Sequence, residues 1–110
     1  MIEDDKSIKF QKQYQQNYVN KILNGKTIGL IFYEASTRTR CSFETAIKML
    51  GGNVIYANVV GSSVKKGESL EDFVRCMECY CDALVIRTNE IGMIERAIRV
   101  ASKPIINAGD

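Results

Sequence analysis

Short apolar runs alternate with amphipathic helical patterns through most of this sequence. The apolar runs predict four strands, at residues 27–33, 53–57, 83–86 and 104–107. Between them, apolar side chains recur at helical spacing in stripes at residues 43–50, 70–77 and 94–101. The alternation predicts an α/β fold in three layers, a four-stranded parallel sheet with helices on both faces.

Strands that are joined through helices run parallel with right-handed crossovers, so every strand-to-helix loop lies at one edge of the sheet. Ligands of such sheets bind at that carboxyl edge. The segments that the pattern gathers there are Ser36–Arg40, Ser62–Lys66, Arg87 and Asn107–Asp110. Together they bring hydroxyls and cations to one side of the sheet.

The segment Ser36–Arg40, with the sequence Ser-Thr-Arg-Thr-Arg, joins the first strand to the first helical stripe. The first backbone N–H groups of a helix have no partner within the helix, and the positive end of its dipole lies there, which suits a phosphate group. Further charge-assisted hydrogen bonds are available from Ser36, Thr37, Thr39, and Arg38 or Arg40. The sequence therefore predicts an anion cradle for a phosphate-bearing ligand.

The composition is that of one soluble globular domain: 110 residues, 45% hydrophobic and 25% charged, with a net charge of +2. That charge gives no reason to expect nucleic acid or an anionic membrane as a partner. No apolar stretch approaches the ~20 residues of a membrane-spanning helix. Polar residues interrupt the first two dozen positions, so we expect no signal peptide or membrane anchor and a cytoplasmic location.

Four cysteines without secretory features indicate reduced thiols. Cys76, Cys79 and Cys81 are close enough in sequence to raise the question of a metal ion. If residues 69–80 are helical, Cys79 and Cys81 point roughly 160° apart, so the three thiols cannot converge on one ion. We therefore predict no metal site.

Residues 1–26 are expected to form an N-terminal helical segment, and residues 27–110 the domain proper. The helical stripe of the first segment ends at Gly25, a suitable residue after a helix end, and consists of Tyr14, Tyr18, Val19, Ile22 and Leu23. Residues 58–68 lack periodicity, and a loop of this length in a compact domain is usually functional or disordered. Ser69 and Asp72 then resemble a capping box.

The residues that follow the first strand resemble the signature of the aspartate and ornithine carbamoyltransferase family. Phe32–Thr45 contains the Ser-Thr-Arg-Thr-Arg and Ser-Phe-Glu wording of that family's carbamoyl phosphate site, and the similarity continues through Lys65–Leu70, Tyr80–Arg87 and Asn107–Asp110. It covers residues 27–110 and implies a carbamoyl phosphate-binding domain. Glu34, the Lys-Lys-Gly-Glu loop and the final Asn-Ala-Gly-Asp favour the aspartate branch.

The resemblance implies roles for the matching residues. The phosphate of carbamoyl phosphate is bound by Ser36, Thr37, Arg38 and Thr39. Thr39 and Arg87 also reach its carbonyl oxygen, while Ser62 and Lys66 serve the active site of a neighbouring subunit in a homotrimer. The implied catalytic residues are Arg38, Thr39, Lys66 and Arg87.

The implied reaction is attack by the α-amino group of L-aspartate on the carbonyl carbon of carbamoyl phosphate. It yields N-carbamoyl-L-aspartate and phosphate in de novo pyrimidine biosynthesis, without a cofactor or a covalent enzyme intermediate. Fixed cations stabilise the charge that develops on the carbonyl and phosphate oxygens, and orientation of two small substrates supplies much of the remaining rate. A regulatory subunit is a further candidate partner.

The sequence also departs from the family pattern. The family's His-Pro-Thr-Gln segment and the arginines that hold aspartate are absent from these 110 residues, which contain no histidine. Thr88 stands where aspartate enzymes commonly have histidine. We therefore expect the chain alone to bind carbamoyl phosphate weakly or not at all, and not to turn over.

Simpler roles remain open for individual residues. Ser36 or Thr37 can be a helix N-cap only, and Arg40 can pair with Glu44 one turn later. Lys65 and Lys66 can belong to a solvated loop, and Tyr33 and Met77 to the core. Glu34 is expected to be a free surface carboxylate in the absence of a second domain, whereas Arg87 beside a buried run needs a partner.

Two other functions compete with the catalytic half-site. One is a non-catalytic oligomerisation or interaction module derived from the same domain, and the other is a fragment of an ornithine carbamoyltransferase. A response to carbamoyl phosphate separates a half-site from a module, because ligands stabilise the folded state that binds them. An unrelated nucleotide-binding protein is disfavoured, since the sequence has neither Gly-x-Gly-x-x-Gly nor a Gly-Lys-Ser/Thr phosphate loop.

Overall fold

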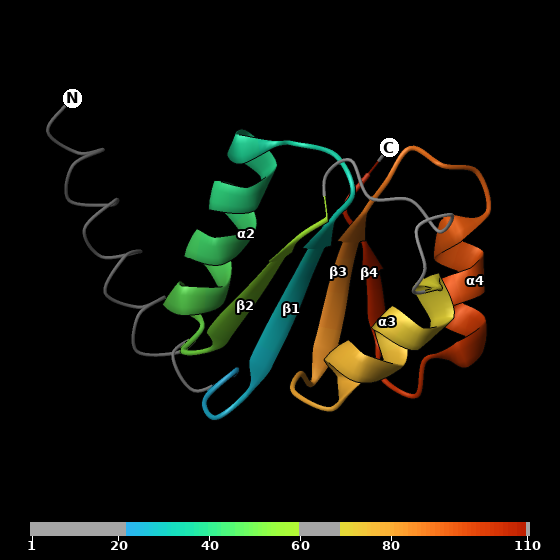
Figure 1. Ribbon diagram of the computed structural model, residues 1–110. Coiled ribbons are helices and arrows are strands. Elements are labelled where there is room, and N and C mark those ends of the chain that lie inside the picture. The colour runs from blue at the N-terminus through green and yellow to red at the C-terminus, as the bar shows by residue number, and fades with distance from the viewer. Residues whose placement is uncertain (1–21, 60–68, 110) are drawn as a thin grey trace, which may run out of the picture.

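The structure, a computed structural model, describes residues 22–59 and 69–109. Within these residues, four strands form one parallel sheet in the order β2-β1-β3-β4 (Figure 1). The strands are β1 Thr27–Phe32, β2 Asn53–Asn58, β3 Ala83–Arg87 and β4 Ile105–Asn107. Each strand that the apolar runs predict is present and lies close to its expected ends.

Helices cover both faces of this sheet, which confirms the predicted three-layer α/β fold. Helix α2, Thr37–Met49, lies on one face, whereas α3, Leu70–Glu78, and α4, Met93–Val100, lie side by side on the other (Figure 1). All the strands point their carboxyl ends the same way, toward the top of Figure 1. The loop from β1 into α2 and the loop from β3 into α4 therefore share one edge.

The core is built on the central strand β1. Three consecutive residues, Leu30, Ile31 and Phe32, are fully buried, because helices cover both sides of the sheet. Leu30 and Phe32 belong to a cluster with Ile47 on the α2 side. Ile31 belongs to the larger cluster under α3 and α4.

Two helical stripes are less buried than the sequence predicts. In α2, Ile47 is buried but Ala46 is exposed, because this helix packs on the edge strand β2 rather than over the middle of the sheet. In α4, Ala97 is fully buried but Ile98 is 53% exposed. Met93 and Ala97, one turn apart, define the packed face of α4, and Ile98 points about 100° away from it.

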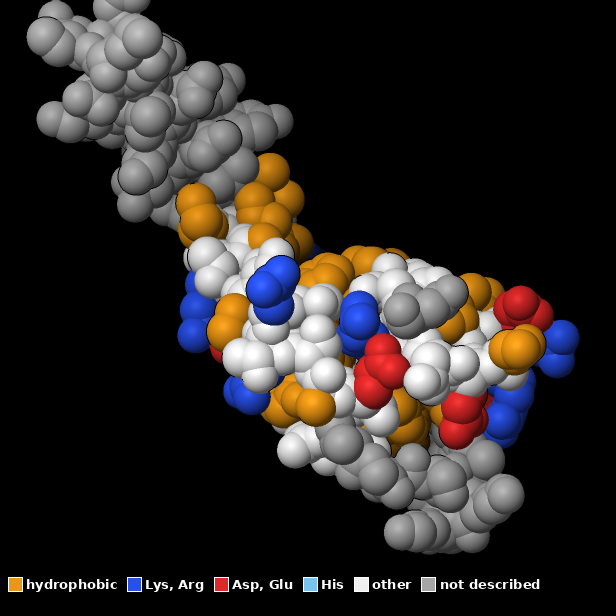
Figure 2. Space-filling model, turned by 90° about the horizontal axis from the view of Figure 1, so that it is seen from above, with side chains coloured by type: hydrophobic (Ala, Val, Ile, Leu, Met, Phe, Trp, Pro, Cys, Tyr) orange, Lys and Arg blue, Asp and Glu red, His pale blue; other side chains and the backbone are white. Residues whose placement is uncertain are grey.

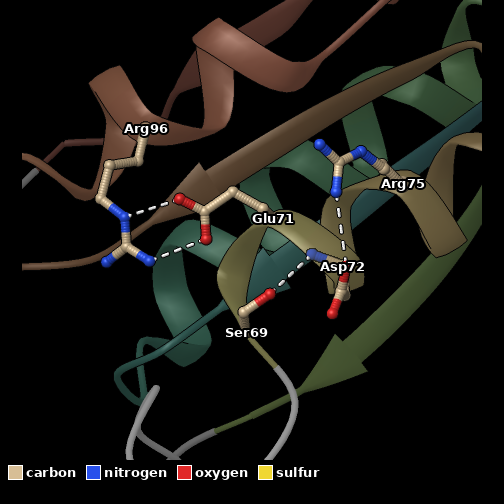
Figure 3. Close-up of polar contacts among 5 residues, drawn as sticks. All are labelled: Ser69, Glu71, Asp72, Arg75 and Arg96. Atoms are coloured by element: carbon tan, nitrogen blue, oxygen red, sulfur yellow. Dashed lines mark hydrogen bonds and ion pairs between the residues drawn. The ribbon is translucent and has the colours of Figure 1, made fainter.

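The start of α3 is fixed by side chains, as Figure 3 shows. Ser69 Oγ accepts a hydrogen bond from the backbone N–H of Asp72 at 3.1 Å, which confirms the N-cap half of the predicted capping box. Glu71 accepts two hydrogen bonds from Arg96 of α4, at 2.9 and 2.8 Å (Figure 3). This bidentate pair joins the two helices and lowers the pKa of Glu71 from 4.5 to about 2.

The Glu71–Arg96 pair predicts a loss of stability in acid. A carboxyl group whose pKa is lowered by folding stabilises the fold fully above its usual pKa, and this contribution disappears as the pH falls from about 4.5 towards about 2. Urea unfolding between pH 6 and pH 2.5 should show a shallower fall for Arg96→Gln than for the unchanged chain. Arg99→Gln, an exposed arginine on the same helix, serves as the control and should keep the original slope. Equal slopes for all three proteins would contradict the prediction.

Gly29 of β1 lies where the end of α3 approaches the sheet. A Cβ atom at this position would stand 2.9 Å from Cys81 Sγ and 2.9 Å from Leu84 Cδ2, closer than packed side chains tolerate. We expect Gly29→Ala to destabilise the fold by about 1–3 kcal/mol through overpacking. Urea midpoints measure this loss, with the exposed substitution Thr45→Ala as control. A midpoint equal to that of the control would contradict the prediction, because it would show that the core rearranges to accommodate the added methyl group.

Candidate functional site

The carboxyl edge of the sheet brings together the ends of β1, β3 and β4. Phe32 of β1 is opposite Arg87 of β3, and Tyr33 donates its backbone N–H to the Arg87 carbonyl oxygen at 2.9 Å. Figure 2 looks down on this edge and shows a basic side chain directly beside an acidic one near its middle. Polar groups from segments far apart in sequence therefore meet at this edge, as the parallel topology predicts.

Ser36 occupies the N-cap position of α2 without capping it. Its φ and ψ are −155° and 84°, and its side chain makes no hydrogen bond to the first turn. The first turn also contains no acidic residue that would neutralise the positive end of the helix. The N-cap alternative for Ser36 is thus not what the structure shows, and its hydroxyl is not used in capping.

The residues expected to bind phosphate surround this helix end. Thr37 and Arg38 are exposed, while Ser36 and Thr39 are half-buried. A hollow of about 220 Å³ lies beside them and is lined by Ala35, Ser36, Thr37, Arg40, Tyr56 and Asn58. Backbone N–H groups, hydroxyls and guanidinium groups at one open helix end are donors of the kind that a tetrahedral anion accepts from.

Arg87, at the end of β3, has the partners that a half-buried cation requires. Its Nη1 donates to the carbonyl oxygen of Ala108 at 3.0 Å, and its Nε lies 3.2 Å from Glu34 Oε1. The Nε contact lacks the direction of a hydrogen bond, so this atom is the one buried side-chain nitrogen or oxygen without a hydrogen-bond partner among residues 22–59 and 69–109. The guanidinium is thus held at this edge by one hydrogen bond and one ion pair, with its Nε buried against Glu34.

The expectation that Glu34 is a free surface carboxylate is wrong. Its side chain is only 28% exposed and pairs with Arg87, which is 21% exposed. The reason is the strand pairing: Glu34 lies two residues after Phe32, the residue opposite Arg87, so the loop after β1 passes beside the guanidinium. Arg87 thus meets a carboxylate at the position where the family resemblance implies a substrate.

The final described residues turn around Arg87. Gly109 has a φ of 100°, which favours glycine, and its N–H donates to Asn107 Oδ1 at 2.9 Å. A Cβ atom on Gly109 would lie 3.4 Å from Arg87 Nη1, so the backbone is close to the guanidinium. Ala108 and Gly109, which follow β4, therefore bring backbone close to Arg87 at this edge of the sheet, as predicted.

Arg40 is held by two partners, one of which the sequence predicts. Its Nε donates to Glu44 Oε2 at 2.5 Å, which confirms the pairing one turn apart, and this hydrogen bond raises the pKa of Arg40. Its guanidinium carbon also lies 3.7 Å from the ring centroid of Tyr56 in β2. Sequence reasoning missed this cation–π contact, because it joins residues of different elements and neither forms a motif.

A second hollow, of about 270 Å³, lies where β3 runs into α4. Its lining contains Glu90, Glu95 and the buried Thr88, but no lysine or arginine. Thr88 Oγ1 accepts a hydrogen bond from the backbone N–H of Glu90 at 3.1 Å and so shapes the loop. The two hollows differ in their charged lining residues, since Arg40 lines the one beside α2 whereas Glu90 and Glu95 line this one.

Some predicted site residues cannot be placed. Ser62, Lys65 and Lys66 lie outside the described residues, as do residues 1–21 and Asp110.

Cys79 follows the end of α3 and is exposed, whereas Cys81 is buried, and burial raises its pKa. Within the described ranges, no group of three or more histidine, cysteine or acidic side chains is placed to hold a metal ion. No helix in the same ranges has the length and apolar character needed to cross a membrane.

Comparison with known proteins gives consistent results. The carbamoyl-P binding domain of the aspartate/ornithine carbamoyltransferase family matches residues 4–110. The aspartate carbamoyltransferase catalytic subunit of Methanococcus vannielii is 45% identical over 107 residues, which are 96% of this chain and 35% of that subunit. The multifunctional protein pyr1-3 of Dictyostelium discoideum is 53% identical over 89 residues, 81% of this chain and 4% of that protein.

Solved structures show the same fold. Aspartate transcarbamoylase from Trypanosoma cruzi in complex with phosphate superposes with a TM-score of 0.81 at 40% sequence identity, over 91% of this chain and 32% of that one. Its complex with carbamoyl phosphate and aspartate gives a TM-score of 0.77 at the same identity, over 91% of this chain and 33% of that chain. This chain therefore spans about a third of the length of the catalytic subunits that it resembles.

The Glu34–Arg87 pair predicts an effect on anion binding. Glu34 repels an anion at the α2 end and offsets the positive charge of Arg87 nearby, so Glu34→Gln should bind inorganic phosphate more tightly. A partly exposed ion pair corresponds to an effect of about two- to fivefold in Kd. Titration calorimetry measures it, with Glu95→Gln, an exposed carboxylate of α4, as control. Unchanged or weaker binding by Glu34→Gln would contradict this account of Arg87.

Proposed function

This chain belongs to the aspartate/ornithine carbamoyltransferase family, and on that premise we propose that it is the carbamoyl phosphate-binding half of an aspartate carbamoyltransferase. The observation that carries the proposal is the uncapped N-terminus of α2, where Ser36–Thr39 lie at the same sheet edge as Arg87. Both features fit a ligand with a phosphate at one end and a carbonyl group at the other.

The aspartate branch of the family is favoured by sequence and by relatives. The sequence is of the aspartate type at three places: Glu34, the Lys65–Glu68 loop and Asn107–Asp110. Relatives from Methanococcus vannielii and Archaeoglobus fulgidus, at 45% and 52% identity, are aspartate carbamoyltransferase catalytic subunits. An ornithine carbamoyltransferase is the alternative, and none of these three segments favours it.

We assign the phosphate of carbamoyl phosphate to the first turn of α2. Its oxygens accept hydrogen bonds from the free N–H groups and from Ser36, Thr37 and Thr39, while Arg38 supplies a full positive charge. Arg87 then lies toward the carbonyl group, because β3 is the strand next to β1. Thr39 and Arg87 bind the carbonyl oxygen in this assignment.

These groups favour acyl transfer by electrostatic stabilisation. When the amino group of L-aspartate attacks the carbonyl carbon, negative charge grows on the carbonyl oxygen and then on the departing phosphate. Arg87 stabilises the first and Arg38 the second, each as a fixed positive charge. The chemistry needs no cofactor, since carbamoyl phosphate already carries a good leaving group.

A complete site requires more than one chain in this proposal. Ser62 and Lys66 reach the active site of a neighbouring subunit, so the proposed enzyme is a homotrimer with shared sites. Its proposed location is the cytoplasm, and a regulatory subunit is a candidate partner. The proposal places a separate segment, residues 1–26, before the domain of residues 27–110, and the aspartate-binding domain in a separate unit. A non-catalytic module that keeps the trimer surface is the second candidate.

The test of the proposal is ligand-dependent stability. A ligand that binds the folded chain at about ten times its Kd raises the free energy of unfolding by about 1.4 kcal/mol. Because the chain alone is expected to bind weakly, carbamoyl phosphate and a bisubstrate phosphonate are each added well above their Kd. Each should then raise the Tm of the 110-residue chain, and Arg38→Ala should lose both shifts. Arg99→Ala removes an exposed arginine elsewhere and should keep them. Equal shifts in both variants would refute the assignment of the phosphate to α2.

Turnover provides the second part of the same test. The 110-residue chain should form no carbamoyl aspartate above the Arg38→Ala level, because the groups that hold aspartate are not among its residues. Appreciable activity of the chain alone would overturn this expectation. No response to either ligand would favour the non-catalytic module.

A further inference from the structure

The first turn of α2 lacks two of the anchors that usually hold a helix end. Ile47, in the last part of the helix, is the one α2 residue that is buried. The Ser36 side chain does not cap the N-terminus. Phe43, which packs against the same core cluster, and Ile47 therefore hold α2 from its second turn onward, and other contacts must hold the first turn, which faces a phosphate.

A chain of stacked side chains connects that first turn to the core. Phe32 of β1 is fully buried, and the Tyr56 ring meets it edge-on, with centroids 5.8 Å apart and planes at 68°. On the Tyr56 ring lies the Arg40 guanidinium, 3.7 Å from the centroid. Arg40 belongs to the first turn of α2, where its N–H donates to the Ser36 carbonyl oxygen at 2.9 Å.

The same stack forms a wall of the anion site. Tyr56 and Arg40 line the hollow of about 220 Å³ together with Ser36 and Thr37. The Arg40 side chain is 42% exposed, and its Nε donates a hydrogen bond to Glu44. The guanidinium is therefore fixed from two directions, by a strand and by its own helix.

We propose that Tyr56 is a positioning residue for the phosphate site, which acts through Arg40 to hold the first turn of α2 against β2. The identification of the anion as the phosphate of carbamoyl phosphate rests on the function proposed above, whereas the positioning itself does not. Tyr56 touches no substrate in this account. Its ring fixes the direction of the N–H groups of residues 37–39, which bind the anion.

The Arg40–Glu44 pair alone does not provide this positioning. Both residues belong to α2, so their hydrogen bond stabilises the helix without attaching it to the sheet. Tyr56 lies in β2. Its aromatic ring attracts a cation, whereas an aliphatic side chain of similar size does not. An aromatic ring at position 56 is thus the specific requirement.

The experiment uses the 110-residue chain and inorganic phosphate as the probe. Tyr56→Leu and Arg40→Gln should each weaken phosphate binding about three- to tenfold, the range expected for loss of a cation–π contact. Tyr56→Phe keeps the ring and should remain within about twofold of the unchanged chain. Arg75→Gln removes an exposed arginine from a comparable ion pair on α3 and serves as the matched control.

Hydrogen exchange separates positioning from general destabilisation. Without phosphate, Tyr56→Leu and Arg40→Gln should speed exchange at the amides of residues 40–43 more than at those of residues 45–49. Uniform acceleration along α2, or unchanged phosphate affinity in Tyr56→Leu, would overturn the proposal. Loss of affinity in Arg40→Gln but not in Tyr56→Leu would make Arg40 a direct ligand instead. Failure of the unchanged chain to bind phosphate would count against the proposed function, while the exchange pattern would still decide the role of Tyr56.

Discussion

The parallel pairing of β1 with β3 is the constraint on which the site depends. Its register sets Phe32 opposite Arg87, so both strands end at the same height. The loop into α2 then starts beside the guanidinium, and Glu34 meets it. A shift of this register by one residue would turn the Arg87 side chain to the other face of the sheet, away from its partners. Burial of both faces of β1 opposes such a shift, because Leu30, Ile31 and Phe32 are all fully buried.

The two faces of the sheet are held in different ways. On the α3 and α4 face, a large apolar cluster is supplemented by the Glu71–Arg96 pair. At the other end of the same helices, Glu78 accepts the backbone N–H groups of Ser102 and Lys103, both at 2.8 Å. Lys103 Nζ in turn donates to the carbonyl oxygens of Glu78 and Cys81. This face is fastened at both ends of its helices, whereas α2 is fastened by Ile47 and the Tyr56 stack.

The sequence was sufficient for the elements and for the open helix end at which the phosphate site is proposed. Apolar runs and helical stripes are local patterns, so they located the strands, the helices and the open N-terminus of α2. The partners of Arg40 and Arg87 were predictable from the sequence to different degrees. Glu44 is one turn from Arg40 and was predictable, whereas Tyr56 and Glu34 meet their cations only through tertiary packing and strand register. Ile98 shows the same limit, because the rotation of α4 on the sheet decides which stripe is buried.

At the carboxyl edge, positively and negatively charged side chains lie in different places. The net charge of +2 is too small to attract an anion to the whole molecule. Arg38 and Arg40 lie at the start of α2, whereas Glu90 and Glu95 line the hollow before α4, and Arg87 ends the strand between those two helices. An anion is thus drawn to one side of Arg87 and repelled from the other. In the proposed function, this arrangement favours one orientation of a ligand that has a charged phosphate and a neutral carbamoyl group, with the phosphate on α2 and the reacting carbonyl group toward Arg87.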